Sequence, residues 1–210
     1  MRKIKTAFEN AKGLSLEALL MFPNLEQPCP GVIICHPHPL YGGNMHNNVT
    51  TDVARALVEK GLAALLFNFR GVGRSEGNFD HGIGETEDAL AALAFLAKLK
   101  EINPLQLGII GYSFGGLVAF KAGEISKEAR AIAGISPVIP SGSLQKCSKP
   151  KLIICGDQDS MVPVSGVLEK AAKMAEPKKI KIIAGADHFW AGIEHKFTSM
   201  VTDFFAGALV

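Results

Sequence analysis

The sequence lacks the features that mark membrane, secreted or nucleic-acid-binding proteins. Its net charge is only +2, from 22 basic and 20 acidic residues, and no long run carries one sign. No apolar run approaches the ~18 residues needed to cross a bilayer. The first residues, MRKIKTAFENAKG, are charged and lack the apolar core of a secretory signal. We therefore expect neither a nucleic-acid partner nor a membrane partner.

The sequence also lacks a C-x-x-C pair, an internal repeat and a linker. Its four cysteines are widely spaced, and Cys35 and Cys155 end apolar runs, where cysteine packs as a small hydrophobe. This usage indicates a reducing compartment, and we expect a cytoplasmic protein. A chain of 210 residues that is 48% hydrophobic fits a single domain, residues 1–210.

The most informative stretch is residues 107–122, LGIIGYSFGGLVAFKA. LGII predicts a buried strand, LVAFKA continues at helical spacing, and a G-x-S-x-G pattern centred on Ser113 lies between them. A strand that turns directly into a helix strains the middle residue and needs small neighbours, which Gly111 and Gly115 supply. The turn would hold the Ser113 hydroxyl at a helix N-terminus, where developing negative charge is favoured. We therefore predict that Ser113 is a nucleophile.

Strands and helices alternate along the chain. A β-hairpin is predicted over 3–22, a proline-containing loop over 23–30, buried strands over 31–35, 62–69, 107–110 and 151–155, and further strands over 129–135 and 179–183. Helices are predicted over 48–60, 84–100, 164–175 and 194–205, and after Ser113. Prolines and glycines argue against a helix in 36–44, and Pro104 is expected to break the chain before the nucleophile strand. The alternation predicts an α/β layer architecture with a mostly parallel sheet.

Polar and glycine-rich segments follow the predicted strands, and ligands bind at the carboxyl ends of strands in such sheets. A serine nucleophile needs a base, and the base needs an acid to orient it. Among the six histidines, only His188 lies in a loop directly after the last strand, so it is the predicted base.

Three aspartates compete for the role of the acid. Asp157 and Asp159 both follow the penultimate strand. Asp157 lies beside a glycine and could simply build the turn, whereas the loop of Asp159 is anchored by Val162 and Pro163. We prefer Asp159, and we rank Asp187 third because it would point away from the site in an extended loop.

The motifs GYSFGG, GDQDSMVP and GADHFW, in this order, resemble those of the α/β-hydrolase superfamily over nearly the whole chain. In that family, the acid of G-x-x-D-x-x-V-P corresponds to Asp159. Two further segments resemble the corresponding segments of small, capless, mostly bacterial predicted hydrolases, a group similar to dienelactone hydrolases. These segments are HPHPLYGGNMHNN and NFRGVGRSEGNFDHGIGE. The resemblance implies a three-layer fold with a twisted, mostly parallel sheet and helices on both faces. Residues 136–150 are too few to form a lid domain, and Pro37 replaces a glycine that is common in the superfamily.

The tetrahedral intermediate of such a reaction needs two N–H donors. Phe114, which follows the nucleophile, should supply one. The other should come from the loop after residue 35, where prolines cannot donate; His38 is the better choice and Leu40 the alternative. The histidines at 36, 38 and 46 also suggest a metal site, but no carboxylate or cysteine accompanies them in a ligand pattern. We expect no metal and no cofactor.

The remaining expectations concern the substrate. Arg70 and Arg74 could bind an anionic substrate, but the glycines around them favour a loop-building role. We expect an open site with six possible wall residues, Tyr41, Phe79, Phe114, Met161, Phe189 and Trp190, although Phe79 fits core packing better. The sequence predicts a serine hydrolase that cleaves small-molecule esters or thioesters of small acyl groups through an acyl-enzyme on Ser113. The alternatives are a hydrolase-fold binding protein without turnover, and an acyltransferase or peptidase that uses the same triad.

Overall fold

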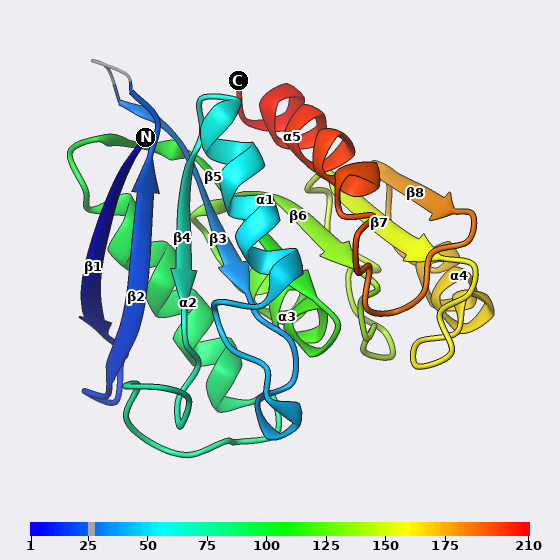
Figure 1. Cartoon of the computed structure of the whole chain (residues 1–210), viewed down its shortest axis with the longest axis horizontal. Coiled ribbons are helices and arrows are strands. Elements are labelled where there is room, and N and C mark those ends of the chain that lie inside the picture. Colours follow the sequence, from blue (N-terminus) through cyan, green and yellow to red (C-terminus); the bar gives the residue numbers. More distant parts are fainter. Residues whose placement is uncertain (25–27) are drawn as a thin grey trace.

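The computed structural model describes residues 1–24 and 28–210, and these residues form one sheet with helices on both of its faces (Figure 1). The middle of the predicted proline-containing loop, residues 25–27, lies outside the described residues. The strands are β1 (Arg2–Glu9), β2 (Ser15–Phe22), β3 (Cys29–Cys35), β4 (Ala63–Phe67), β5 (Ile102–Tyr112), β6 (Ala129–Ile135), β7 (Lys151–Gly156) and β8 (Lys178–Ile183). The helices are α1 (Asn48–Glu59), α2 (Gly84–Ala97), α3 (Phe114–Ile125), α4 (Val164–Ala172), α5 (His195–Leu209) and the short 3₁₀ helix η1 (Pro39–Tyr41).

The eight strands lie in the order β1-β2-β4-β3-β5-β6-β7-β8. β2 is antiparallel to both of its neighbours, and every other pair of adjacent strands is parallel. The predicted hairpin is present, with its ladder running from the Arg2–Phe22 pair to the Glu9–Ser15 pair. The predicted α/β architecture with a mostly parallel sheet is therefore confirmed.

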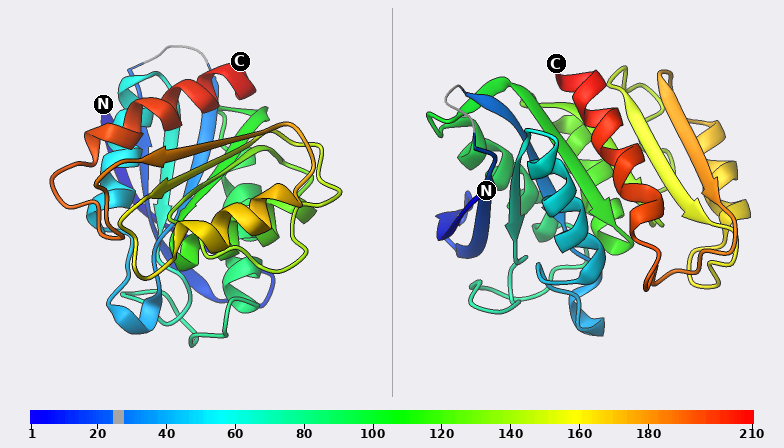
Figure 2. Two further views of the ribbon diagram at one scale, coloured as in Figure 1. Left: turned by 90° about the vertical axis from the view of Figure 1, so that its right-hand side faces the viewer. Right: turned by 45° about the horizontal axis from the view of Figure 1, so that its top comes forward.

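Alternate residues of the central strands enter two separate cores, because successive side chains of a strand point to opposite faces. Ile33 of β3 and Ile109 of β5 pack in the core beneath α2, α3 and α4. Val32 and Ile110, their neighbours in sequence, pack in the core beneath α1 and α5. The rotated views show the sheet between these two helical layers (Figure 2). Burial on both faces explains why these strands are continuous apolar runs in the sequence.

Two local predictions are wrong. Segment 36–44 was expected to contain no helix, but η1 forms there because Pro39 occupies its first turn, where no backbone N–H is needed. The side chain of His38 caps η1 at its start, and Gly42, with φ 79, ends it. Pro104 was expected to break the chain, but it lies inside β5. The pairing of β3 with β5 jumps from Cys29–Ile102 to Gly31–Leu107, so Pro104 lies where the ladder is interrupted and requires no donor.

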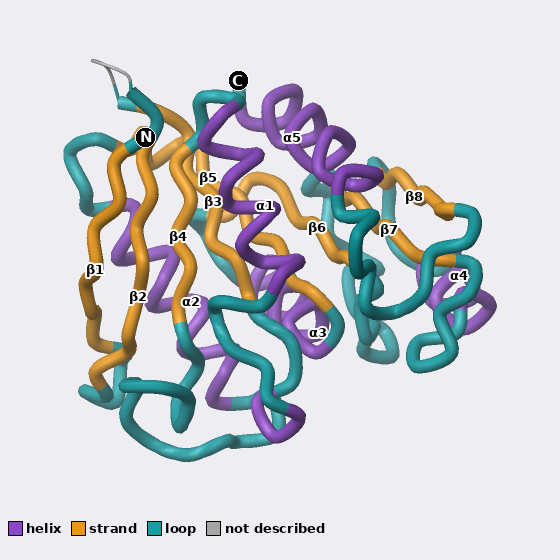
Figure 3. Tube along the Cα trace, in the orientation of Figure 1, coloured by secondary structure: helices purple, strands orange, loops and turns teal. Residues whose placement is uncertain are grey.

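The loops that follow the parallel strands gather at the carboxyl edge of the sheet (Figure 3). Residues 136–150, between β6 and β7, contain no helix or strand and form no lid. Within the described residues, no helix is long and apolar enough to span a bilayer.

Candidate active site

Ser113 lies at the sharp turn between β5 and α3, in a backbone conformation of φ 56 and ψ −116. This left-handed conformation is costly for a residue with a side chain. A Cβ on Gly111 would collide with the carbonyl of Gly115, and a Cβ on Gly115 would collide with the carbonyl of Cys35 in β3. Both motif glycines are therefore required by the close approach of backbone segments that the turn creates.

The turn places the Ser113 hydroxyl against the predicted base and acid. Ser113 Oγ lies 3.0 Å from His188 Nε2, and His188 Nδ1 lies 2.8 Å from Asp159 Oδ2. An ionised carboxylate accepts hydrogen bonds only, so Nδ1 carries the imidazole proton and Nε2 is free to accept from the serine hydroxyl. The structure thus joins the three predicted residues, from three different loops, in one hydrogen-bonded chain.

The Asp159 carboxylate is fully buried and well supplied with donors. Its Oδ1 accepts hydrogen bonds from the backbone N–H groups of Met161 at 3.0 Å and Val162 at 2.8 Å. Burial opposes ionisation, but hydrogen bonds from His188, Val162 and Ser136 outweigh it and lower the pKa of Asp159. The carboxylate therefore stays charged beside the imidazole near neutral pH.

The two competing aspartates have other roles. Asp157 accepts a hydrogen bond from the Gly185 N–H at 2.7 Å and so links the loops that follow β7 and β8. Asp187 accepts from the N–H groups of Phe189 and Trp190, both at 3.0 Å, and shapes the turn after His188. Asp157 thus joins two loops and Asp187 shapes a turn, whereas Asp159 is the aspartate that contacts the imidazole.

The two predicted oxyanion donors lie at the same site. Phe114 is the first residue of α3, and His38 follows Pro37 in the loop after β3. Among residues 1–24 and 28–210, neither of these backbone N–H groups donates a hydrogen bond. Leu40 N–H, the alternative donor, is engaged with His38 Nδ1 at 3.2 Å. Within the described residues, the Leu40 N–H is thus occupied, whereas the two preferred N–H groups have no hydrogen-bond acceptor.

A cavity of about 150 Å³ opens beside Ser113. Three of the six predicted wall residues line it: Tyr41, Met161 and Phe189, of which Tyr41 is 84% exposed. Phe79 and Phe114 instead pack against the His38 ring, with ring centroids 4.9 and 4.8 Å away, and Trp190 is fully buried. The other residues that line the cavity are Pro37, His38, Gly42, Gly43, Asn47, Tyr112, Ser113 and His188.

The other histidines and arginines that the sequence singled out make no hydrogen bond to the side chains of Ser113, His188 or Asp159 among the described residues. No cluster of three or more His, Cys, Asp or Glu side chains suited to a metal ion occurs in the described part of the chain. Arg70 is buried and pairs with Asp88 at 2.8 Å, as expected of a loop-building residue. Arg74 is exposed, and its backbone N–H donates to the Glu17 carboxylate.

Tyr112, immediately before the serine, makes a hydrogen bond to the His188 loop that the sequence did not reveal. Its buried hydroxyl donates to the backbone carbonyl of His188 at 2.7 Å. Burial, together with the charges of Asp159 and Asp187, raises the pKa of Tyr112, so the hydroxyl remains a donor. This bond ties the histidine loop to the serine turn, and its partner lies too far along the sequence for any local pattern to predict it.

The chain resembles known proteins both in sequence and in structure. A family model described as serine aminopeptidase, S33, matches residues 26–142. The chain is 36% identical over 186 residues to an uncharacterized protein of Rickettsia prowazekii (strain Madrid E). The aligned region covers 83% of this chain and 78% of that protein.

Two solved structures resemble the whole fold. An α/β serine hydrolase homologue from Coxiella burnetii has 32% sequence identity and a TM-score of 0.87, covering 97% of each chain. A member of the α/β serine hydrolases without a lid, from Xanthomonas campestris, has 27% identity and a TM-score of 0.86, covering 100% of this chain and 96% of that one. These similarities confirm the predicted lidless fold.

Proposed function

We propose that this chain, which belongs to the serine aminopeptidase S33 family of α/β serine hydrolases, cleaves esters or thioesters of small acyl groups. The observation that carries the proposal is the hydrogen-bonded chain from Ser113 through His188 to Asp159 beside an open cavity. A serine hydroxyl is a poor nucleophile near neutral pH, and this arrangement supplies the base that activates it. The four buried free cysteines support our expectation that the enzyme works in a reducing cytoplasm.

The first half of the reaction forms the acyl-enzyme. Ser113 Oγ attacks the acyl carbon while its proton passes to His188 Nε2, 3.0 Å away. Asp159 stabilises the resulting imidazolium through its bond to Nδ1. The carbonyl oxygen becomes an oxyanion, which accepts hydrogen bonds from the N–H groups of Phe114 and His38. When the intermediate collapses, His188 gives its proton to the leaving alcohol or thiol.

The second half regenerates the enzyme. Water attacks the acyl carbon of the ester on Ser113, and His188 removes a proton from the water. The acid product leaves, and Ser113 Oγ recovers its proton from His188 Nε2. An acceptor alcohol or amine in place of water would give acyl transfer by the same steps.

The lining of the cavity favours esters over peptides with a free N-terminus. An aminopeptidase must bind the α-ammonium group of its substrate, which a nearby carboxylate does best. None of the described residues that line the cavity is Asp or Glu. The volume of about 150 Å³ suits a short acyl chain or a group the size of benzene.

The test is burst kinetics with p-nitrophenyl esters of increasing acyl length, on the wild type and Ser113→Ala. We expect a burst that Ser113→Ala abolishes, a loss of kcat of roughly 10⁴-fold or more, and unchanged stability. Short acyl groups should react fastest because of the size of the cavity. A fluorophosphonate probe should label wild-type Ser113, whereas a hydrolase-fold protein that only binds its ligand would stay unlabelled.

A matched pair of variants tests the acid. Asp159→Asn should lower kcat by roughly 10⁴-fold, because a neutral amide neither fixes the imidazole tautomer nor stabilises the imidazolium. Asp157→Asn, two residues away, should have a much smaller effect, since the Asp157 side chain contacts Gly185. The reverse ranking would assign the acid to Asp157.

A further inference from the structure

We propose that Tyr112 is a positioning residue for the base, because its hydroxyl holds the backbone of His188 in place beside Ser113. The inference rests on the proposed catalytic roles of Ser113 and His188. Tyr112 ends β5 and directly precedes the nucleophile, at a position that the G-x-S-x-G pattern leaves open.

The base is carried by a long loop that starts away from the nucleophile. The histidine loop, residues 184–194, leads from β8 to α5 and contains no helix or strand. In the sheet, β6 and β7 lie between β5 and β8, so the loop brings His188 back across three strand spacings, roughly 14 Å. Since no strand pairing reaches His188, other contacts must fix its position.

Tyr112 supplies the contact that holds the His188 backbone. Its hydroxyl donates to the His188 carbonyl at 2.7 Å. Among the described residues, this is the one hydrogen bond of the His188 backbone, whose N–H has no acceptor. Tyr112 is 4% exposed and His188 is 6% exposed, so little water competes for the bond.

The bond joins the base to the nucleophile by a short path. Tyr112 and Ser113 are consecutive residues, and the Tyr112 ring also packs on the imidazole, with ring centroids 5.5 Å apart. The contact of 3.0 Å between Ser113 Oγ and His188 Nε2 thus closes a small circuit that returns through the His188 carbonyl and Tyr112. A displacement of the histidine loop is therefore resisted at the residue next to the nucleophile.

The next carbonyl of the same loop has a different partner. Asn48, the first residue of α1, donates from Nδ2 to the Phe189 carbonyl at 3.2 Å and to the Glu194 carboxylate at 2.7 Å. Asn48 is exposed, and Phe189 lines the cavity but carries no group that can transfer a proton. The loop is thus anchored at two consecutive carbonyls, and the anchor from Tyr112 is the one that holds the base.

The decisive variant is Tyr112→Phe, which removes the hydroxyl and keeps the ring. We expect kcat for a p-nitrophenyl ester to fall roughly 10- to 100-fold, because a small misplacement of the base costs this much. KM should stay unchanged, because His188 serves both halves of the reaction and the ring that lines the cavity remains. The rate at which a fluorophosphonate labels Ser113 should fall as well, since His188 must take the serine proton in that step.

Ser75→Ala is the matched control for stability. Ser75 is buried, and its hydroxyl also donates to a backbone carbonyl at 2.7 Å, that of Asn68, while it accepts from the Glu17 N–H. Within the described residues, its hydroxyl makes no hydrogen bond to the candidate site. Ser75→Ala should lower the melting temperature but leave kcat and the labelling rate unchanged. Equal losses of kcat in Ser75→Ala and Tyr112→Phe would overturn the positioning role.

Asn48→Ala distinguishes the bond to the base from the general order of the loop. Water can replace this exposed donor, and the His188 carbonyl keeps its own partner, so kcat should change by less than about twofold. A loss as large as that of Tyr112→Phe would show that any anchor of the loop has the same effect, which would contradict a specific role of Tyr112.

A double variant tests whether Tyr112 acts through His188. Adding Tyr112→Phe to His188→Ala should leave the residual hydrolysis unchanged, because the imidazole that Tyr112 positions is already absent. A further loss of the size seen in the wild-type background would show that Tyr112 acts on Ser113 or the substrate directly, and the inference would be wrong.

One readout needs no turnover, so the failure of this inference is distinguishable from that of the proposed function. The low-field resonance of the His188 Nδ1 proton reports its exchange with water. This exchange should be faster in Tyr112→Phe than in the wild type, and should keep the wild-type rate in Ser75→Ala. If wild-type Ser113 stayed unlabelled while the exchange became faster in Tyr112→Phe, the hydrolase would be rejected and the positioning role kept. An unchanged exchange rate in Tyr112→Phe would overturn the role of Tyr112, whatever the activity.

Discussion

His36 is neutral in the folded protein because both of its ring nitrogens are committed. Nδ1 lies 2.7 Å from the carbonyl of Pro37, which can only accept, so Nδ1 carries the proton. Nε2 accepts from the Phe69 N–H at 3.1 Å. Burial lowers the pKa of His36 to about 4, although its bond to Pro37 opposes the shift. The ring thereby fastens the loop that carries His38 to the loop that follows β4.

This burial predicts an acid-sensitive stability. The unfolded chain takes up a proton on His36 near pH 6.5, whereas the folded chain takes it up only near pH 4. The contribution of His36 to the free energy of unfolding is therefore fully present above pH 6.5 and is lost as the pH falls towards 4. It should amount to roughly 3 kcal/mol of unfolding free energy. Urea unfolding at several pH values between 7.5 and 4 measures it.

His36→Gln isolates this contribution, because glutamine does not titrate. The variant should be less stable than the wild type at pH 7.5, and the difference should shrink as the pH falls. His195→Gln, at an exposed histidine in the first turn of α5, is the control and should follow the wild-type curve. A His36→Gln curve parallel to that of the wild type over the whole range would contradict this explanation.

At the residue scale, short sequence motifs were enough to predict which residues would meet at the candidate site. Ser113, Asp159 and His188 each follow a strand, and parallel strands bring such positions to one edge. Tyr112 could not be predicted in the same way. Its polar partner, the His188 carbonyl, lies 76 residues away along the chain, and only the packed fold brings the two together.

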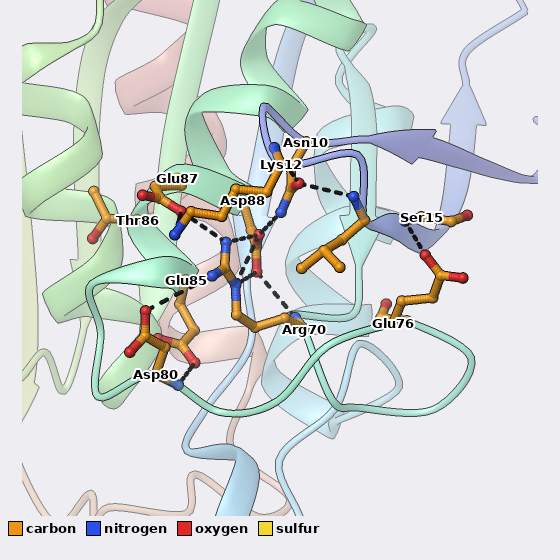
Figure 4. A network of polar contacts seen from close by, with 12 residues as sticks. Asn10, Lys12, Ser15, Arg70, Glu76, Asp80, Glu85, Thr86, Glu87 and Asp88 are labelled. Atoms are coloured by element: carbon orange, nitrogen blue, oxygen red, sulfur yellow. Dashed lines mark hydrogen bonds and ion pairs between the residues drawn. The ribbon is translucent and has the colours of Figure 1, made fainter.

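At the scale of elements, a buried ion-pair network holds three segments together (Figure 4). Arg70, in the loop after β4, donates to Asp88 of α2 through both Nε and Nη2, at 3.0 and 2.8 Å. Asn10, in the hairpin turn between β1 and β2, donates to the same carboxylate at 2.7 Å. The network orders the loop that carries Phe79, whose ring packs on His38 beside the site.

Breaking this network from one side should be costly. Arg70→Met leaves the Asp88 carboxylate buried without its cation, and we expect a loss of about 3–5 kcal/mol of unfolding free energy. Asp88→Leu should cost a similar amount for the complementary reason. The double variant should recover much of the loss, because two apolar side chains can replace a buried ion pair. Chemical denaturation of the four proteins completes the cycle.

The Lys60–Asp203 pair is the matched control. Its ends lie 2.9 Å apart, like those of the buried pair, but both side chains are about half exposed or more. Lys60→Met should cost at most about 1 kcal/mol. If Lys60→Met and Arg70→Met had equal costs, burial would not be the cause of the stability of the Arg70 network.

Whether a segment forms a strand or a helix was predictable wherever an apolar run or a helical spacing extended over several residues. The strands of the sheet and the helices that cover it follow these patterns. The errors fall where one residue changes the local rule. Pro39 starts a 3₁₀ turn, because only the first turn of a helix tolerates its missing N–H. Pro104 remains inside β5, because the ladder with β3 is interrupted at that point. Both outcomes depend on neighbouring strands or side chains that a local pattern does not contain.

At the scale of the whole molecule, both cores draw on distant parts of the chain. One core extends from Phe8 in β1 to Met174 after α4, and the other from Met21 in β2 to Leu209 in α5. The sheet between them continues from β1 to β8 among the described residues. We propose that residues 1–210 form a single domain, because no boundary across the sheet would leave both cores intact.

A single domain should unfold in one cooperative transition. Trp190, the only tryptophan, is buried against Phe197, so its fluorescence reports the packing of α5, whereas far-ultraviolet circular dichroism reports all helices and strands. We expect the two signals to coincide during urea unfolding, and calorimetry to give a ratio of calorimetric to van't Hoff enthalpy near one, with an enthalpy of roughly 150 kcal/mol near 60 °C. An earlier loss of the tryptophan signal would instead show that the histidine loop and α5 separate while the rest of the sheet stays folded. The contact between His188 Nε2 and Ser113 Oγ would then be lost before the fold, because the two residues would lie in parts that separate at different urea concentrations.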